Sequence, residues 1–124
     1  MRCLIVDDSP EFLEAARRLL QQEGIDVVGV ASTGDGAVRL AEELRPDATL
    51  VDIDLGGEDG LSVAQRLADD PGHSAGKVIL ISTHDEEEFL EAIEANPAVG
   101  FIAKSEISGD AIRQLVGPSA GRRG

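Results

Sequence analysis

Five short apolar runs constrain the fold of this chain more than any other feature of its sequence. They are rich in Val and Ile, and they do not alternate strictly with polar residues as strands with one solvent-facing side do. Continuous apolar runs of this length are typical of strands that helices cover on both faces, as in a parallel sheet. The five runs are residues 3–6, 27–31, 48–53, 77–82 and 99–103.

The segments that follow these runs carry apolar side chains at helical spacing. The first begins with Ser9, an N-cap residue, and Pro10, which suits the first helical position, and it ends before Gly24, a C-cap former. In the fourth segment we expect the side chains of Phe89, Leu90 and Ile93 to be buried. The predicted helices are residues 10–23, 35–44, 60–68, 84–96 and 108–116.

Strand and helix therefore alternate five times, which predicts an α/β fold with a doubly wound, five-stranded parallel sheet and right-handed crossovers. The 124 residues are the size of one domain, which we place at residues 1–116. The Gly-rich segment 117–124 has few apolar residues, so we expect it to be a flexible tail.

Charge and composition exclude several classes of function. The formal net charge of −13 argues against direct binding to nucleic acid or to an anionic membrane surface. The single cysteine, Cys3, cannot form an internal disulfide and is interpreted as a core residue. The sequence shows neither a signal peptide nor a run long enough to span a membrane, so a cytoplasmic protein is expected.

Polar side chains follow four of the five predicted strands. Because ligands of open parallel sheets bind outside the carboxyl ends of the strands, these residues are candidates for one common site. Strand two, by contrast, ends in Ser and Thr residues that suit an ordinary turn. The candidates are Asp7 and Asp8 after the first strand, Asp52 and Asp54 after the third, Ser82, Thr83 and His84 after the fourth, and Lys104 after the fifth.

Two readings are open for the adjacent acids Asp7 and Asp8. The chain has 24 acidic residues, so the pair could simply point to water. Alternatively, these two acids and Asp52 together bind a hard divalent cation such as Mg²⁺, which prefers oxygen ligands. In the second reading Lys104 supplies further positive charge, and the site suits a phosphoryl group in transfer, with Asp52 as the nucleophile.

At four places the sequence resembles the receiver domain of bacterial two-component response regulators. The motifs are VDD at 6–8, LVDIDLGGEDG at 50–60, ILIST at 79–83 and GFIAK at 100–104, in the family's order and spacing. The resemblance covers roughly residues 2–116. It implies a (βα)5, flavodoxin-like fold with strand order 2-1-3-4-5.

The resemblance also implies a role for each matched residue. Asp52 matches the phospho-acceptor, which receives a phosphoryl group from a kinase phosphohistidine. Asp8 matches a direct ligand of the Mg²⁺ cofactor, Asp7 an acid that acts on the metal mainly through water, and the backbone carbonyl of Asp54 a further ligand. The remaining matches are Ser82 and Thr83 at the switch and phosphate-binding position, Lys104 as the phosphate-pairing lysine, and Phe101 as the switch aromatic.

Four positions depart from the family's common pattern. Gly56 stands where a proline is common, so we expect a looser loop after Asp52. Ser105 stands where many members have a proline after the lysine, so no cis-proline is expected there. Asp54 and His84 occupy places that tune phosphoryl lifetime in the family, and our hypothesis is that they set the rate of water attack.

The expected partner is a histidine kinase or a histidine phosphotransfer protein, and Leu13 is a candidate contact for it. The sequence leaves no room for a DNA-binding output domain, so it is either a natural single-domain regulator or a fragment of a longer one. For a single-domain regulator we expect output through another protein or a phosphorylation-dependent homodimer. Signalling would involve the surface of the fourth helix, fifth strand and fifth helix. On this reading the chain is not an enzyme, because it catalyses only its own phosphorylation and dephosphorylation.

Two alternative functions come from other classes of protein. The residues Asp52 and Asp54 fit the D-x-D start of haloacid-dehalogenase-type phosphatases, but that motif normally ends the first strand of a longer chain. The other alternative is a binding module that has the receiver fold but does not depend on phosphorylation. A phosphatase would release phosphate catalytically, whereas a receiver would not. A receiver would form a metal-dependent covalent phosphoryl adduct, whereas the binding module would not.

Overall fold

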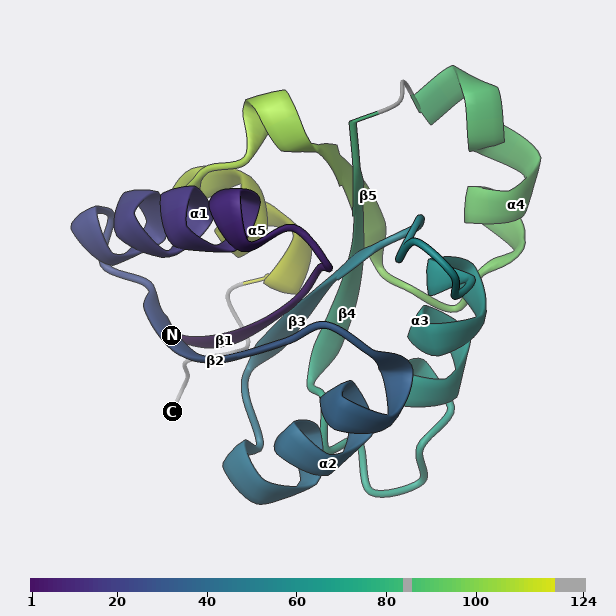
Figure 1. The fold of residues 1–124 in the computed structure, drawn as a ribbon, viewed down its shortest axis with the longest axis horizontal. Helices are drawn as coiled ribbons and strands as arrows, with labels where there is room; N and C mark the ends of the chain where they lie inside the picture. Colours follow the sequence, from purple (N-terminus) through teal and green to yellow (C-terminus); the bar gives the residue numbers. More distant parts are fainter. Residues whose placement is uncertain (84–85, 118–124) are drawn as a thin grey trace.

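The computed structural model describes residues 1–83 and 86–117, with the exception of the side chain of Glu86. Five parallel strands form one sheet in the order β2-β1-β3-β4-β5, which confirms the predicted strand order (Figure 1). The strands are β1 (Arg2–Val6), β2 (Asp26–Ala31), β3 (Ala48–Asp52), β4 (Lys77–Ser82) and β5 (Gly100–Ala103).

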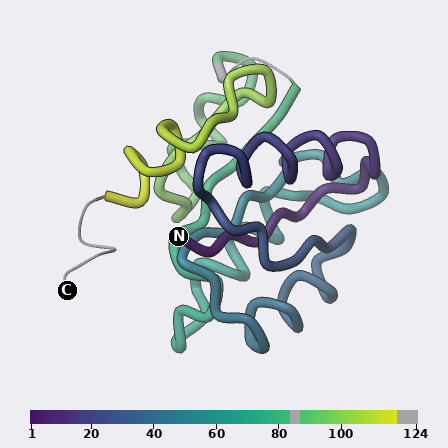
Figure 2. The backbone as a smooth tube through the Cα atoms, turned by 90° about the vertical axis from the view of Figure 1, so that its left-hand side faces the viewer, coloured from purple at the N-terminus to yellow at the C-terminus, as the bar shows by residue number. Residues whose placement is uncertain are grey.

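Helices cover both faces of this sheet, as continuous apolar strands require. In Figures 1 and 2, α1 and α5 lie together on one face, and α2 lies on the opposite face with α3 and α4. The helices are α1 (Pro10–Gln22), α2 (Gly34–Leu44), α3 (Gly60–Ala68), α4 (Leu90–Ala95) and α5 (Gly109–Val116), with the 3-10 turns η1 (Glu86–Phe89) and η2 (Lys104–Glu106).

Side-chain caps define where four of the helices begin. Ser9 accepts a hydrogen bond from the backbone N–H of Phe12, and Ser108 accepts one from Ala111. Thr33 and Asp59 cap α2 and α3 in the same way. These bonds satisfy backbone donors that have no partner inside the helix, so the polar residue before each apolar pattern sets the start of the helix.

The core consists of two apolar clusters, one on each face of the sheet. Successive residues of β1 alternate between them: Ile5 belongs to the cluster under α1 and α5, and Leu4 to the cluster under α2 and α3. Cys3 is fully buried in the first cluster, as predicted, and burial raises the pKa of its thiol to about 12. The strands are thus held rigidly in the middle of the domain.

The fourth predicted helix is shorter and less buried than expected. Residues 86–89 form a 3-10 turn and only residues 90–95 are α-helical, while residues 84 and 85 lie outside the described part of the chain. The prediction that Leu90 is buried was wrong, because its side chain is 41% exposed. Phe89 and Ile93 are half-buried against the core and lie four residues apart, whereas Leu90 is rotated by about 100° from Phe89 in helical geometry.

Across the described residues, no helix combines the length and apolar character needed to span a membrane.

Candidate functional site

The polar residues that the sequence singled out meet at the carboxyl edge of the sheet. Asp52 is the last residue of the central strand β3, Asp7 follows β1, and Lys104 follows β5. Asp7 continues the register of β1, because its backbone N–H donates to the carbonyl of Ala31 at 2.9 Å. The parallel arrangement therefore converts residues far apart in the sequence into neighbours.

Three carboxylates form the centre of this site. One oxygen from each of Asp7, Asp8 and Asp52 lies within 4.8 Å of the others. Asp7 is completely buried and Asp52 is 6% exposed, whereas Asp8 is exposed to solvent. Two of the three like charges are thus withdrawn from water, which is unfavourable unless positive charge lies close by.

Lys104 supplies that positive charge from the end of β5, which lies beyond β4 at the edge of the sheet. Its Nζ lies 2.5 Å from Asp7 Oδ2 and 2.9 Å from Asp52 Oδ2, and its side chain is only 12% exposed. Burial lowers the pKa of Lys104, but the contacts and charges of Asp7 and Asp52 outweigh burial, so that the pKa is raised. Lys104 is therefore a charged ammonium group in the folded protein.

The pKa of Asp52 is raised above its ordinary value, and burial is the main cause. Hydrogen bonds from the Asp54 backbone N–H, at 3.0 Å, and from Lys104 oppose this shift, and the charge of Asp7 adds to it. Burial thus disfavours the charged form of the Asp52 carboxylate, while one ammonium group and one backbone amide favour it. A further cation beside it would favour the charged form more strongly.

Asp7 belongs to a group of carboxylates whose spacing could hold a cation. Its Oδ1 accepts a hydrogen bond from the Ser9 backbone N–H at 2.9 Å. Its buried Oδ2 pairs with Lys104 by distance but has no partner in hydrogen-bond geometry within the described part of the chain. A buried oxygen of this kind, with the carboxylates of Asp8 and Asp52 beside it, fits a hard divalent cation such as Mg²⁺.

The loop after β3 has a backbone that only glycine allows at position 56. Gly56 has a φ of +75°, and a Cβ built on it would lie 2.7 Å from Asp8 Oδ2. Its N–H donates to Asp54 Oδ1 at 3.1 Å. Because proline is restricted to a φ near −65°, the family's common proline cannot adopt this loop conformation. The Gly-Gly sequence therefore belongs to a differently shaped loop beside the acids; whether it is looser stays a prediction.

Gly60 packs directly beneath the candidate nucleophile. A Cβ at this position would lie 1.7 Å from the backbone carbonyl oxygen of Asp52. The Gly60 N–H donates to the Ile53 carbonyl at 3.1 Å, and the residue begins α3. The absence of a side chain thus lets α3 approach the end of β3 and hold Asp52 in place.

The other candidate residues are distributed around this centre. Ser82 ends β4, is 1% exposed and pairs in register with Ala103, the residue before Lys104. Thr83 is exposed, and Phe101 on β5 is half-buried against the core. Leu13 lies on α1, where it is half-buried beside a shallow surface groove that Pro10 and Val30 also line. His84 lies outside the described residues.

Phe12 is a member of the site that the sequence analysis did not single out. Its ring centroid lies 4.3 Å from Lys104 Nζ, which is a cation–π contact. The only sequence signal was its place in the first turn of the helix that follows Asp7 and Asp8. An apolar residue at that place serves the core equally well, so the pattern alone did not reveal the contact.

Glu58 was also missed, because its contact joins two loops. Its Oε1 accepts a hydrogen bond from the backbone N–H of Gly34 at 2.9 Å, at the start of α2. The bond ties the loop after Asp52 to a helix N-terminus, where a carboxylate is favoured. No local pattern links residues 24 positions apart.

Comparison with known proteins gives a consistent result. Residues 3–116 match the family model described as "Response regulator receiver domain". The chain is 41% identical over 117 residues to the positive alginate biosynthesis regulatory protein of Pseudomonas aeruginosa, with 93% of this chain and 46% of that protein aligned. It is 38% identical over 86 residues to protein PilH of the same organism, covering 69% of this chain and 70% of PilH.

A solved structure shows the same similarity. The signal receiver domain of the response regulator NarL from Mycobacterium tuberculosis, described as putative, superposes with a TM-score of 0.76 at 31% identity, covering 93% of this chain and 94% of that one. The chain spans about half the length of the curated transcriptional regulators that it matches. The similarity therefore concerns one domain of those proteins.

Proposed function

The chain belongs to the family of response regulator receiver domains, and on that basis we propose that Asp52 accepts a phosphoryl group in a Mg²⁺-dependent reaction. The donor would be the phosphohistidine of a histidine kinase or of a histidine phosphotransfer protein. The observation that carries the proposal is the position of Asp52 at the tip of the central strand, between the Lys104 ammonium and the acids Asp7 and Asp8. The site would act as a signalling acceptor in the cytoplasm and not as an enzyme with turnover.

The proposed metal ligands come from two segments of the chain, at the carboxyl ends of β1 and β3. Asp8, the Asp52 side chain and the backbone carbonyl of Asp54 would hold Mg²⁺ directly, and Asp7 would act mainly through water. A bound Mg²⁺ supplies positive charge that stabilises the oxygens of the transferring phosphoryl group. The grouping of the Asp7, Asp8 and Asp52 carboxylates within 4.8 Å supports this assignment, because a hard divalent cation prefers oxygen ligands.

Asp52 acts as the nucleophile in the proposed step. One of its carboxylate oxygens forms a bond to phosphorus while the phosphorus–nitrogen bond to the donor imidazole breaks, and the nitrogen keeps the bonding electron pair. The Asp54 N–H on Oδ1 and Lys104 on Oδ2 fix the plane of the carboxylate before the reaction. Orientation of this kind lowers the entropic part of the barrier.

Lys104 would change partners when the phosphoryl group arrives. In the structure it neutralises Asp7 and Asp52, and the new phosphoryl oxygens would offer it more negative charge at the same place. Ser82 and Thr83, at the end of β4, would then donate their hydroxyls to the phosphoryl group. The half-buried Phe101 on β5 would follow with a rotamer change, which alters the surface formed by α4, β5 and α5.

Three further roles belong to the same proposal. Asp54 and His84 would set the rate at which water hydrolyses the aspartyl phosphate. Leu13, at the edge of its surface groove on α1, would contact the kinase. Replacement of Leu13 by Arg should then reduce transfer from a kinase while labelling by acetyl phosphate persists, with urea unfolding as the check on stability.

Intact-mass spectrometry after incubation with Mg²⁺ and acetyl phosphate tests the central proposal. We expect a single added phosphoryl group on the wild-type protein, and none when EDTA replaces the metal or when Asp52 is replaced by Asn. Glu58→Gln is the matched control, since it removes a carboxylate from the loop after β3, keeps an acceptor for the Gly34 N–H and should leave the adduct in place. Comparison of the two variants shows whether the adduct requires Asp52 itself or any carboxylate of this loop.

Two results would count against the proposal. An adduct that persists in Asp52→Asn would place the acceptor elsewhere. If the wild type forms neither a phosphoryl adduct nor a stable beryllofluoride complex in the presence of Mg²⁺, the chain is a receiver-fold binding module that does not depend on phosphorylation.

A further inference from the structure

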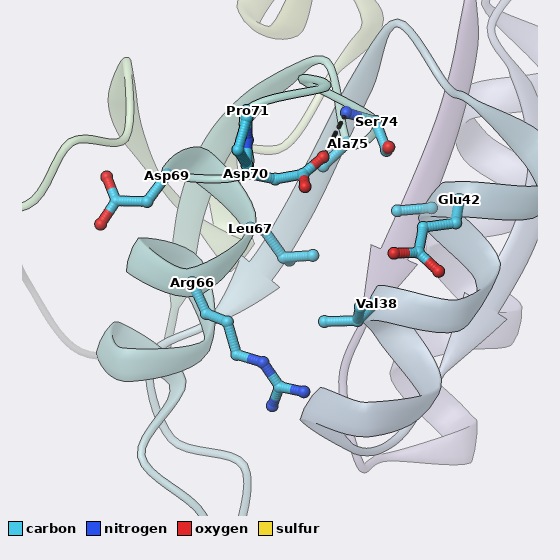
Figure 3. A pocket seen from close by; sticks show the side chains of 10 residues that line it. Val38, Glu42, Arg66, Leu67, Asp69, Asp70, Pro71, Ser74 and Ala75 are labelled. Carbon is cyan, nitrogen blue, oxygen red and sulfur yellow. Dashed lines mark hydrogen bonds between the residues drawn. The ribbon is translucent and has the colours of Figure 1, made fainter.

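A surface groove of about 390 Å³ lies between α2 and α3, away from the carboxylate site (Figure 3). It is bounded by α2, by α3 and by the connection that leads from α3 into β4. None of the candidate phosphorylation residues lines it. Its volume falls within the range of about 300–1,000 Å³ that is usual for ligand pockets.

The floor of the groove is apolar and comes from α2, α3 and the turn before β4. Val38 on α2 and Leu67 on α3 point toward each other across the space (Figure 3). Ala41 and Ala75 also line it, and both are almost completely buried. Residues of the connection after α3 form about half of the lining, so the shape of the groove depends on the two helices and on this connection together.

The rim of the groove carries an excess of negative charge. The carboxylates of Glu42 and Asp70 extend into the space from opposite sides, whereas Asp69 points away from it (Figure 3). Arg66 is the cation among the lining residues, and its guanidinium is paired with Asp35 at 3.0 Å. Two carboxylates therefore face the groove, while the lining cation Arg66 is already paired and Arg45, outside the lining, contributes positive charge near Asp70.

Asp70 is held rigidly in this position. Its Oδ2 accepts a hydrogen bond from the Ser74 backbone N–H at 3.0 Å, which is the dashed line in Figure 3. Hydrogen bonds from Ser74 lower the pKa of Asp70 below its ordinary value, and Arg45 contributes by its charge. The carboxylate is thus pre-oriented and ionised over a wide pH range, which favours recognition of a cation.

We propose that this groove is a docking site for a basic segment of a partner protein, one arginine of which lies on Val38 and Leu67 with its guanidinium between Glu42 and Asp70. An arginine side chain matches both parts of the surface, because its aliphatic stem packs on apolar side chains while its planar head bonds to carboxylates. The net charge of −13 would also speed the approach of a basic partner. The site acts independently of the carboxylate site.

The test uses a short peptide with one arginine between two leucines, titrated into isotopically labelled protein and followed by NMR. We expect saturable shifts of the amides of Val38, Leu67 and Ala75. Glu42→Gln or Asp70→Asn should each weaken binding about 3- to 5-fold, as for a partly exposed ion pair. The matched controls are Glu43→Gln, at a residue that does not line the groove, and Asp69→Asn, at a residue whose carboxylate points away from it; both should leave the affinity unchanged.

A second peptide, with citrulline in place of arginine, keeps the shape of the side chain and removes its charge. It should not bind. Equal binding of both peptides would overturn the proposal. Three other results would also overturn it. The first is a set of shifts that map to Asp8 and its neighbours, and the second is an equal loss of peptide affinity in all four variants. The third is the absence of saturable shifts at the highest soluble peptide concentration. The exposed Glu42→Gln change separates loss of the contact from loss of folding, because the side chain lies on the helix surface.

Discussion

Replacement of Lys104 by Met should destabilise the metal-free protein strongly at neutral pH. The variant keeps most of the aliphatic stem and removes only the ammonium group. That group is the cation that contacts the buried carboxylates of Asp7 and Asp52, at 2.5 and 2.9 Å. Without it the two negative charges remain near each other in an environment that water hardly reaches.

The size of the effect follows from the geometry of the site. Two carboxylate oxygens within 4.8 Å of each other repel by at least about 3.5 kcal/mol at an effective dielectric constant of about 20. Removal of one partner from a buried ion pair typically costs about 3–5 kcal/mol, which agrees with this value. We therefore expect the free energy of unfolding to fall by about 3–5 kcal/mol.

Urea unfolding followed by far-ultraviolet circular dichroism measures this loss. The chain has no Trp or Tyr, and urea does not screen charges as guanidinium chloride does. With a slope of about 1.5 kcal/mol per molar, the midpoint should fall by about 2–3 M. Lys77→Met is the matched control, because Lys77 is exposed at the start of β4 and its replacement should change stability by less than about 0.5 kcal/mol.

A double mutant distinguishes lost electrostatic compensation from lost packing. Adding Asp52→Asn to Lys104→Met removes the repulsion and should restore most of the lost stability, as should lowering the pH. The reasoning is refuted if Lys104→Met costs no more than Lys77→Met. It is equally refuted if the loss stays the same with Asn at position 52.

Three further predictions concern the same edge of the sheet. Gly60→Ala places a Cβ against the Asp52 carbonyl and should cost about 1–3 kcal/mol or more in urea unfolding, whereas Gly57→Ala, with open space around it, should be nearly neutral. Because the folded state raises the pKa of Asp52 above 3.8, the native protein binds a proton there more tightly than the unfolded chain does. The free energy of unfolding should therefore fall as pH rises from 3.8 through the raised pKa, and the urea midpoints of Asp52→Asn should not show this pH dependence. Mg²⁺ at ten times its dissociation constant should raise the free energy of unfolding by about 1.4 kcal/mol. Thermal unfolding at several Mg²⁺ concentrations measures this increase, and Asp8→Asn should greatly reduce it.

Much of the fold could be predicted from local pattern. The five apolar runs gave the strands to within two residues, and the polar residue before each of α1, α2, α3 and α5 caps that helix. The short α4 was the exception, because residues 89 and 93 turn toward the core while Leu90 turns to solvent. A pattern of apolar residues does not by itself reveal which of two adjacent side chains faces the core.

The chemical groups of the site were also determined by the sequence. The carboxyl ends of parallel strands lie at one edge of a sheet, so acids after the first and third strands and a lysine after the fifth had to come together. The tertiary structure decided the contacts between segments that no local pattern connects. Lys104 lies against the ring of Phe12, Glu58 binds the start of α2, and Gly60 fits beneath Asp52. These contacts depend on how helices and loops pack across the sheet, and packing is a property of the whole chain rather than of any short segment of it.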